Sequence, residues 1–118
     1  MLGVRSFLTA FRAGRRFRRA QEFERAGRSV EALGVAREGL SILHSSQLIR
    51  TRPSESAVLV MLTVTVERLA SQLGQQGATE ADLRAVLQIL ESYPGRVGRT
   101  AELNTEWIAM LRDHLENR

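Results

Sequence analysis

The chain has 118 residues, enough for one domain with a modest core, and 43% hydrophobic with 25% charged residues is ordinary globular usage, which argues against disorder throughout. It contains no cysteine, which excludes disulfides, thiolate metal sites and cysteine nucleophiles. The net charge of +4 is uneven, because residues 1–19 hold six arginines and no acid, whereas the remaining residues hold eleven arginines and thirteen acids. A basic N-terminal segment therefore precedes a nearly neutral remainder.

Glycine and proline breaks divide the chain into five segments whose apolar residues recur at helical spacing. The predicted helices cover about residues 2–26, 30–45, 55–75, 80–92 and 101–118. The last four each follow a residue type that caps helix N-termini, namely Ser29, Ser54, Thr79 and Thr100. Asp82 completes a capping box with Thr79. Residues 46–53 are a predicted connector, and residues 93–95 a helix stop. We predict an all-α fold of about five helices in antiparallel helix–turn–helix pairs.

Residues 57–66, AVLVMLTVTV, are the one stretch that also suits a buried strand, because they are rich in valine and threonine. We expect a helix, since no glycine or proline interrupts residues 54–73 and strands are seldom so long. This longest apolar run is about half of the roughly 20 residues that cross a bilayer, so no transmembrane segment is predicted.

Small residues, an aromatic residue and a turn glycine recur at fixed spacing in residues 20–43. They are Ala20, Phe23, Gly27, Ala32 and Gly39, followed by Leu40. This pattern resembles the second half of a tetratricopeptide repeat. The resemblance implies that the small residues let two helices pack closely, and it implies protein binding in a concave groove. A degenerate tetratricopeptide-like fold and a simple helical bundle are the two architectures considered. Gly39 should then face the first helix, where leucine would overpack the contact and alanine would be neutral or stabilising.

No catalytic constellation is apparent. His44 and His114 both lie near predicted helix C-termini, where a donating side chain suits the last carbonyls. Neither has a candidate nucleophile or a positioned acid, because Asp113 and Glu116 point away from His114 on a helix. The glycines lack the preceding strand and the lysine of a phosphate-binding loop. We predict a protein that is not an enzyme and that uses no cofactor, metal or small-molecule substrate.

Residues 1–19 are interpreted as an amphipathic helical arm, separate from a helical domain of residues 20–118 that folds alone. On a helical wheel most of the arginines lie opposite the apolar residues, although Arg18 falls on the apolar side. The residues predicted to bind an anionic surface are Arg5, Arg12, Arg15, Arg16, Arg18 and Arg19. Those predicted to dock by apolar contact are Phe7, Phe11 and Phe17. This pattern is typical of a helix in a membrane interface, and equally of one docked on its own domain.

Three functions fit these features. The preferred one is an adaptor that binds a protein partner and whose arm docks on an anionic membrane surface, through residues 2–19, or on an acidic partner. The second is a small subunit of a larger assembly. The alternative is a nucleic-acid-binding protein with arginines on phosphates and Phe11 or Phe17 stacked on bases, but the remainder of the chain is slightly acidic. We expect a cytoplasmic protein, with peripheral membrane association or organellar targeting by the arginine-rich N-terminus as further options.

Overall fold

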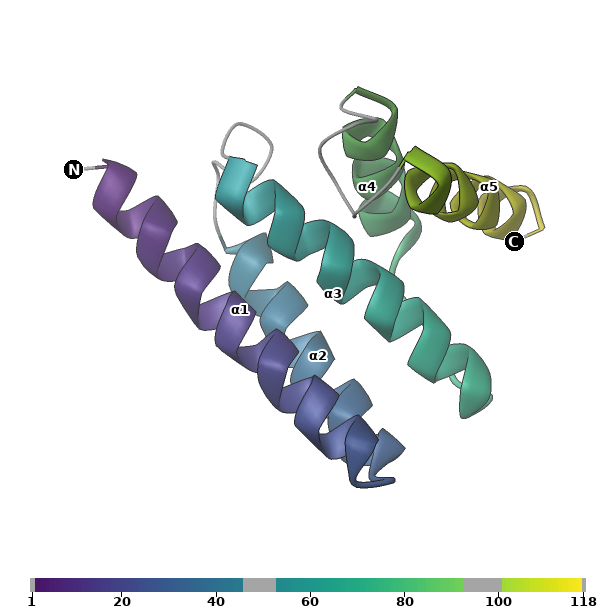
Figure 1. The fold of residues 1–118 in the computed structure, drawn as a ribbon, viewed down its shortest axis with the longest axis horizontal. Coiled ribbons are helices and arrows are strands. Elements are labelled where there is room, and N and C mark those ends of the chain that lie inside the picture. Colours follow the sequence, from purple (N-terminus) through teal and green to yellow (C-terminus); the bar gives the residue numbers. More distant parts are fainter. Residues whose placement is uncertain (1, 46–52, 93–100, 118) are drawn as a thin grey trace. The chain divides into compact units, whose positions relative to one another are not determined.

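The computed structural model describes the backbone of residues 2–45, 53–92 and 101–117, and the side chains of residues 8–45, 56–92 and 105–117. The helices are α1 (Leu2–Arg25), α2 (Ser29–His44), α3 (Pro53–Gln72), α4 (Glu80–Ser92) and α5 (Ala101–Glu116) (Figure 1). These described residues contain no strand, so the all-α prediction is confirmed and residues 57–66 belong to a helix. The chain forms two compact units, Met1–Gly77 and Ala78–Arg118, which are described separately below.

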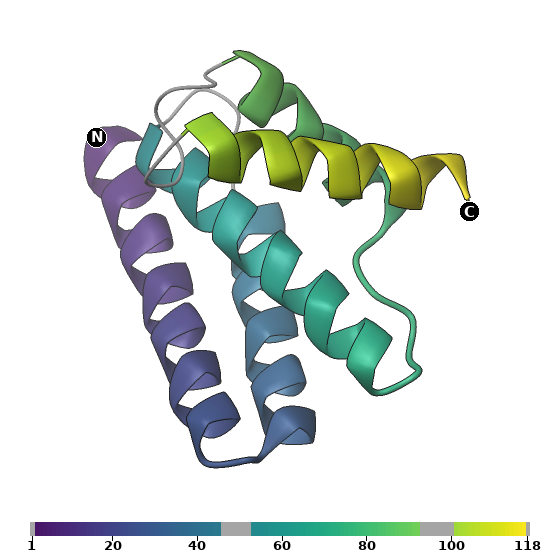
Figure 2. The ribbon, with the colours of Figure 1, turned by 45° about the vertical axis from the view of Figure 1, so that its right-hand side comes forward.

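Gly27 closes the connection between α1 and α2. Its φ of +77° lies in the left-handed region that favours glycine. Around it, the Arg28 N–H donates to the Phe23 carbonyl at 2.9 Å, and the Gly27 N–H donates to the Glu24 carbonyl at 3.0 Å. This is the Schellman motif, which satisfies the last carbonyls of a helix while the chain reverses. Accordingly, α2 returns antiparallel beside α1 (Figure 2).

The same turn makes the predicted cap at Ser29 wrong. Helix α2 begins at Ser29 itself, and its N-cap is Arg28, whose side chain forms no capping hydrogen bond. The reason is that the Schellman turn already ends at Arg28, whose carbonyl accepts a helical hydrogen bond from the Ala32 N–H at 3.0 Å. No residue is left between the turn and the helix to serve as a separate cap.

The bounds of α3 also differ from the prediction. The helix begins at Pro53, before the expected cap at Ser54, because proline suits a first helical position, where no N–H is needed. It ends at Gln72 rather than at residue 75, because Gly74 adopts a φ of +66° and turns the chain. The predicted connector before Pro53, the helix stop at residues 93–95 and the cap at Thr100 lie outside the described residues.

Small residues line the buried side of α1 and much of that of α2, and α1, α2 and α3 contact one another pairwise. The buried small residues are Ala10, Ala13 and Ala20 of α1 and Ala32, Ala36 and Gly39 of α2. Short side chains on both helices let their axes approach closely. The larger buried side chains of this unit come mainly from α3, with Leu59, Leu62 and Leu69 almost fully inaccessible.

The structure does not divide the chain at residue 19. That boundary falls inside the continuous helix α1, and Ala10 and Ala13 before it are buried, as is Ala20 after it. Residues before the boundary therefore contribute to the core of the first unit. From the sequence we predict that residues 20–118 fold alone. From the structure we expect instead that the first unit does not stay folded when α1 is cut at residue 19.

The second unit consists of α4 and α5, which pack on each other. The predicted capping box at the start of α4 is present. The Asp82 N–H donates to the Thr79 hydroxyl at 3.2 Å, and the Thr79 N–H donates to the Asp82 carboxylate at 3.3 Å. Leu83, Val86 and Leu90 of α4 and Leu111 of α5 are fully buried.

Thr63 provides a test of packing in α3. Its side chain is fully buried, and its hydroxyl has no hydrogen-bond partner. Since valine has the same shape without this unsatisfied group, Thr63→Val should raise the free energy of unfolding by about 1 kcal/mol in urea denaturation. The matched control is Thr65→Val. Thr65 is also buried, but its hydroxyl is not a fully buried group that lacks a hydrogen-bond partner. A Thr63→Val protein that is less stable than wild type would contradict the conclusion that the Thr63 hydroxyl is buried without a hydrogen-bond partner.

Candidate anion-binding surface

One side of α1 carries exposed arginines together with exposed apolar residues. This arginine face consists of Leu8, Phe11, Arg12, Arg15, Arg18 and Arg19, all of which are exposed. With 3.6 residues per helical turn, these six positions fall within about 120° of the helix circumference. The buried alanines Ala13 and Ala20 lie on the other side of the helix. A single helix thus supplies core packing on one side and a basic surface on the other.

The structure places Phe11 differently from the prediction. Phe11 is 52% exposed and lies on the arginine face, where the Arg15 guanidinium is 6.0 Å from the centre of its ring. Phe17 is only half-buried, and Leu8 is 50% exposed. The physical reason is that close helix packing admits only small side chains on the buried side, so the large Phe11 is excluded from it. The side chains of Arg5 and Phe7 lie outside the described residues.

A signal for this arrangement was present in the sequence. Alanines recur at positions 10, 13 and 20, which share one side of a helix. Hydrophobicity alone assigns phenylalanine to the buried side, whereas the alanine spacing indicates the side on which another helix approaches.

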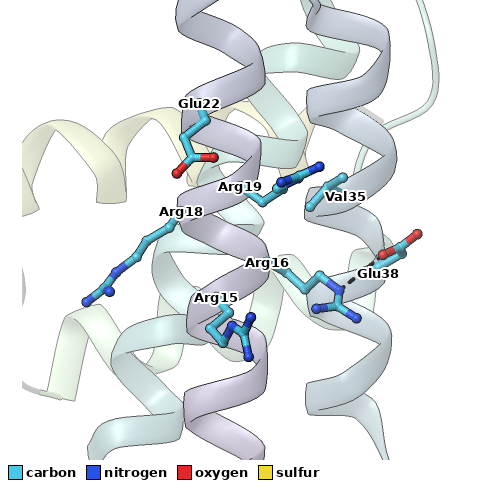
Figure 3. Close-up of a pocket in the computed structure, with 7 residues that line it drawn as sticks. All are labelled: Arg15, Arg16, Arg18, Arg19, Glu22, Val35 and Glu38. Carbon is cyan, nitrogen blue, oxygen red and sulfur yellow. Dashed lines mark hydrogen bonds and ion pairs between the residues drawn. The ribbon is translucent and has the colours of Figure 1, made fainter.

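A shallow groove of about 460 Å³ adjoins the arginine face between α1 and α2. It is lined by Arg15, Arg16, Arg18, Arg19 and Glu22 of α1 and by Val35 and Glu38 of α2. Figure 3 shows Arg16 and Arg19 extending toward α2, whereas Arg18 extends away from it. The Arg16 Nε donates to the Glu38 carboxylate at 3.2 Å. Arg16 is therefore occupied within the fold, although the sequence grouped it with the surface-binding arginines.

Outside the arginine face, most arginines whose side chains are described have an acidic partner in the fold. The pairs are Arg16–Glu38, Arg28–Glu31, Arg68–Glu24, Arg84–Glu80 and Arg112–Glu91. Arg37 instead donates to the backbone carbonyl of Gln76. Among arginines whose side chains are described, those without an ion pair or hydrogen bond are Arg12, Arg15, Arg18, Arg19 and Arg25. All five belong to α1, so unneutralised positive charge is concentrated on this helix.

The acids nearest to this charge are mostly engaged elsewhere. Both oxygens of the Glu24 carboxylate accept from Arg68 of α3, one of them at 2.9 Å, and this hydrogen bonding lowers the pKa of Glu24 below its ordinary value. Glu38 is paired with Arg16. Glu22 is exposed and falls within the same 120° of the helix circumference, one turn beyond Arg18, so it offsets one of the four positive charges. The surface consequently keeps a net positive charge.

The residues that carry the tetratricopeptide resemblance lie in and around the α1–α2 hairpin. Ala20 and Ala32 are fully buried, Leu40 is 6% exposed and Gly27 forms the turn. Two guanidinium groups lie over the ring of Phe23, with Arg19 at 5.0 Å and Arg28 at 4.8 Å from its centre. Gly39 is buried at a point where both α1 and α3 approach α2.

In the part of the chain that the structure describes, no group of three or more histidine, cysteine, aspartate or glutamate side chains could hold a metal ion. No helix there combines the length and the apolar character needed to cross a membrane.

The arginine face is thus the most distinctive feature of the described surface, since it joins unpaired guanidinium groups to exposed apolar side chains. Comparison of the chain with protein-family models, with curated proteins and with solved structures found no match.

Proposed function

We propose that this protein is a non-enzymatic interaction module, an adaptor or a small subunit of an assembly, that docks on an anionic surface through the arginine face of α1. The observation that supports this proposal is the distribution of ion pairs. Outside the arginine face, every arginine with a described side chain except Arg25 has an acceptor, whereas those of the arginine face have none. The tetratricopeptide-like character of the α1–α2 hairpin, and a protein partner for the helical body, are parts of the same proposal.

The physical argument concerns what a guanidinium gains from contact. A solvent-exposed ion pair between two residues of the same protein contributes little to its stability, about 0–1 kcal/mol. A guanidinium beside an anionic surface gains about 1 kcal/mol, and several that lie on one rigid helix gain it together. Because α1 is fixed by α2 and α3, its backbone needs no further ordering on binding, and only the arginine side chains lose conformational freedom.

A charge-matched pair of double variants tests the proposal. Arg12 and Arg18 are exposed and have no ion pair or hydrogen bond in the described structure, so Arg12→Gln with Arg18→Gln should leave the thermal melt unchanged. The control is Arg84→Gln with Arg112→Gln, which removes the same charge from exposed positions of the second unit.

Binding of both double variants is measured against anionic vesicles, a single-stranded oligonucleotide and polyglutamate at moderate salt. We expect the α1 variant to lose about 2 kcal/mol, roughly thirtyfold in affinity, for the probe that wild-type protein binds best. The control variant should change by only a fewfold. Equal losses in the two variants would mean that net charge alone drives binding, which would refute the proposal.

A further inference from the structure

We infer that the anionic surface is a phospholipid bilayer, and that Leu8 and Phe11 insert below the headgroups while the neighbouring arginines contact the phosphates. This inference rests on the proposed function and names its partner. It starts from the exposed apolar side chains. The large hydrophobic residues that are clearly exposed in the described structure are Leu8, Phe11, Val30 and Met110. Two of these four, Leu8 and Phe11, share the arginine face.

Leu8 and Phe11 are three residues apart, so they lie one helical turn from each other on the same side of α1. Around the circumference, Phe11 falls between Arg15 and Arg18, and Leu8 falls between Arg15 and Arg19. A helix in the plane of a membrane interface buries apolar side chains while its basic side chains contact the headgroups, and Leu8 and Phe11 with the adjacent arginines supply both kinds of contact. The long arginine side chains can reach the headgroups while the apolar residues enter the acyl region.

The shape of the face suits a flat surface. Residues 8–19 of α1 form a continuous helix that spans about 17 Å at 1.5 Å per residue. In the first unit, α2 and α3 contact α1, and α1 lies at the edge of the three-helix arrangement (Figures 1 and 2). The arginine face therefore presents a band of side chains about 120° wide on a straight helix, with Leu8 and Phe11 inside the band and long arginine side chains at its borders.

Other anionic partners would contact fewer of the side chains on the arginine face. A single-stranded nucleic acid would engage the arginines with phosphates and stack bases on Phe11, but an aliphatic side chain such as Leu8 offers no stacking surface. An acidic peptide would pair with the arginines and leave both apolar side chains in water. A bilayer satisfies the charge and removes both apolar side chains from water.

The absence of cysteine permits a direct test of insertion with single labelled sites. Leu8→Cys and Val30→Cys each receive an environment-sensitive fluorophore; both sites are exposed, but Val30 belongs to α2 and lies off the arginine face. The probes are vesicles of equal parts phosphatidylglycerol and phosphatidylcholine, with pure phosphatidylcholine vesicles as the uncharged control. We expect a blue shift at position 8 with the anionic vesicles alone, and no shift at position 30. If the labelled protein sediments with the anionic vesicles but the emission of the fluorophore at position 8 does not shift, insertion is refuted.

A second experiment compares substitutions that leave the charge unchanged. Leu8→Ala with Phe11→Ala should weaken vesicle binding at least about tenfold, and the loss should persist at high salt because apolar burial is not screened. Val30→Ala is the control and should bind like wild type. Equal binding by the double variant would overturn the inference.

The two proposals fail in different ways. If the oligonucleotide or polyglutamate binds more tightly than the vesicles and depends on Arg12 and Arg18, the bilayer is wrong while docking through the arginine face stands. If none of the three probes binds at moderate salt, both proposals fall.

Discussion

Deletion of residues 1–19 is expected to abolish the cooperative unfolding of the first unit. Helix α1 packs on both α2 and α3, and its residues Ala10 and Ala13 are buried. Removing most of α1 would expose the apolar residues that it covers on two helices. The loss should be comparable with the whole stability of a small domain, about 5–15 kcal/mol.

Circular dichroism during thermal unfolding is the appropriate readout for this deletion, because the single tryptophan, Trp107, belongs to the second unit. The control is full-length protein with Leu8→Ala, Phe11→Ala, Arg12→Gln and Arg18→Gln, which alters only exposed residues of α1. This variant should melt like wild type. Wild-type cooperativity in residues 20–118 would show that residues 1–19 are a separable arm and would contradict the packing described here.

Substitution of Gly39 should give the second large effect. A Cβ added at Gly39 would lie 2.8 Å from a terminal methyl of Leu62 and 3.2 Å from the Cβ of Arg16. Since Leu62 is fully buried, its methyl groups have little room to move. We expect Gly39→Leu to lower the free energy of unfolding by about 3 kcal/mol, the upper end of typical overpacking costs. Gly39→Ala should also destabilise, whereas the sequence alone indicates a neutral or stabilising effect.

Gly34 supplies the matched control for Gly39. It belongs to the same helix and is exposed, and an added Cβ there would meet nothing within 4 Å. Gly34→Ala should therefore stabilise the protein by up to about 1 kcal/mol, through helix propensity alone. Urea denaturation of the four single variants, with alanine and leucine at each position, separates propensity from packing. If Gly39→Ala proves as stable as Gly34→Ala, the close contact is absent.

The existence of the helices could be predicted because apolar residues recur at helical spacing in each and turn-forming residues separate them in the sequence. The capping box of Thr79 and Asp82 shows how local this information is, since both partners lie within one helical turn. Helices α2 and α3 begin earlier than the sequence predicts, because the residue type at a helix start is not unique. Several residue types fit a helix start, and the preceding Schellman turn, not the serine, determined where α2 begins.

The candidate site was only partly predictable. Arg12, Arg15, Arg18 and Arg19 lie on the surface as expected, because long charged side chains rarely enter a core. The position of Phe11 depended on which side of α1 the other helices approach. The constraint on Gly39 involves Leu62, which follows it by more than twenty residues and belongs to another helix. Sequence spacing along one helix carries no information on such a contact.

Arginine footprinting of the wild-type protein tests the central claim most directly, because it reports which surface is covered when an anionic partner binds. The protein is treated with an arginine-specific dicarbonyl reagent, with and without the anionic vesicles, and modification at each site is quantified by mass spectrometry. Our account predicts protection of Arg12, Arg15, Arg18 and Arg19, while Arg84 and Arg112 of the second unit react as in free protein. Equal protection of all these arginines, or protection of the second unit alone, would contradict it.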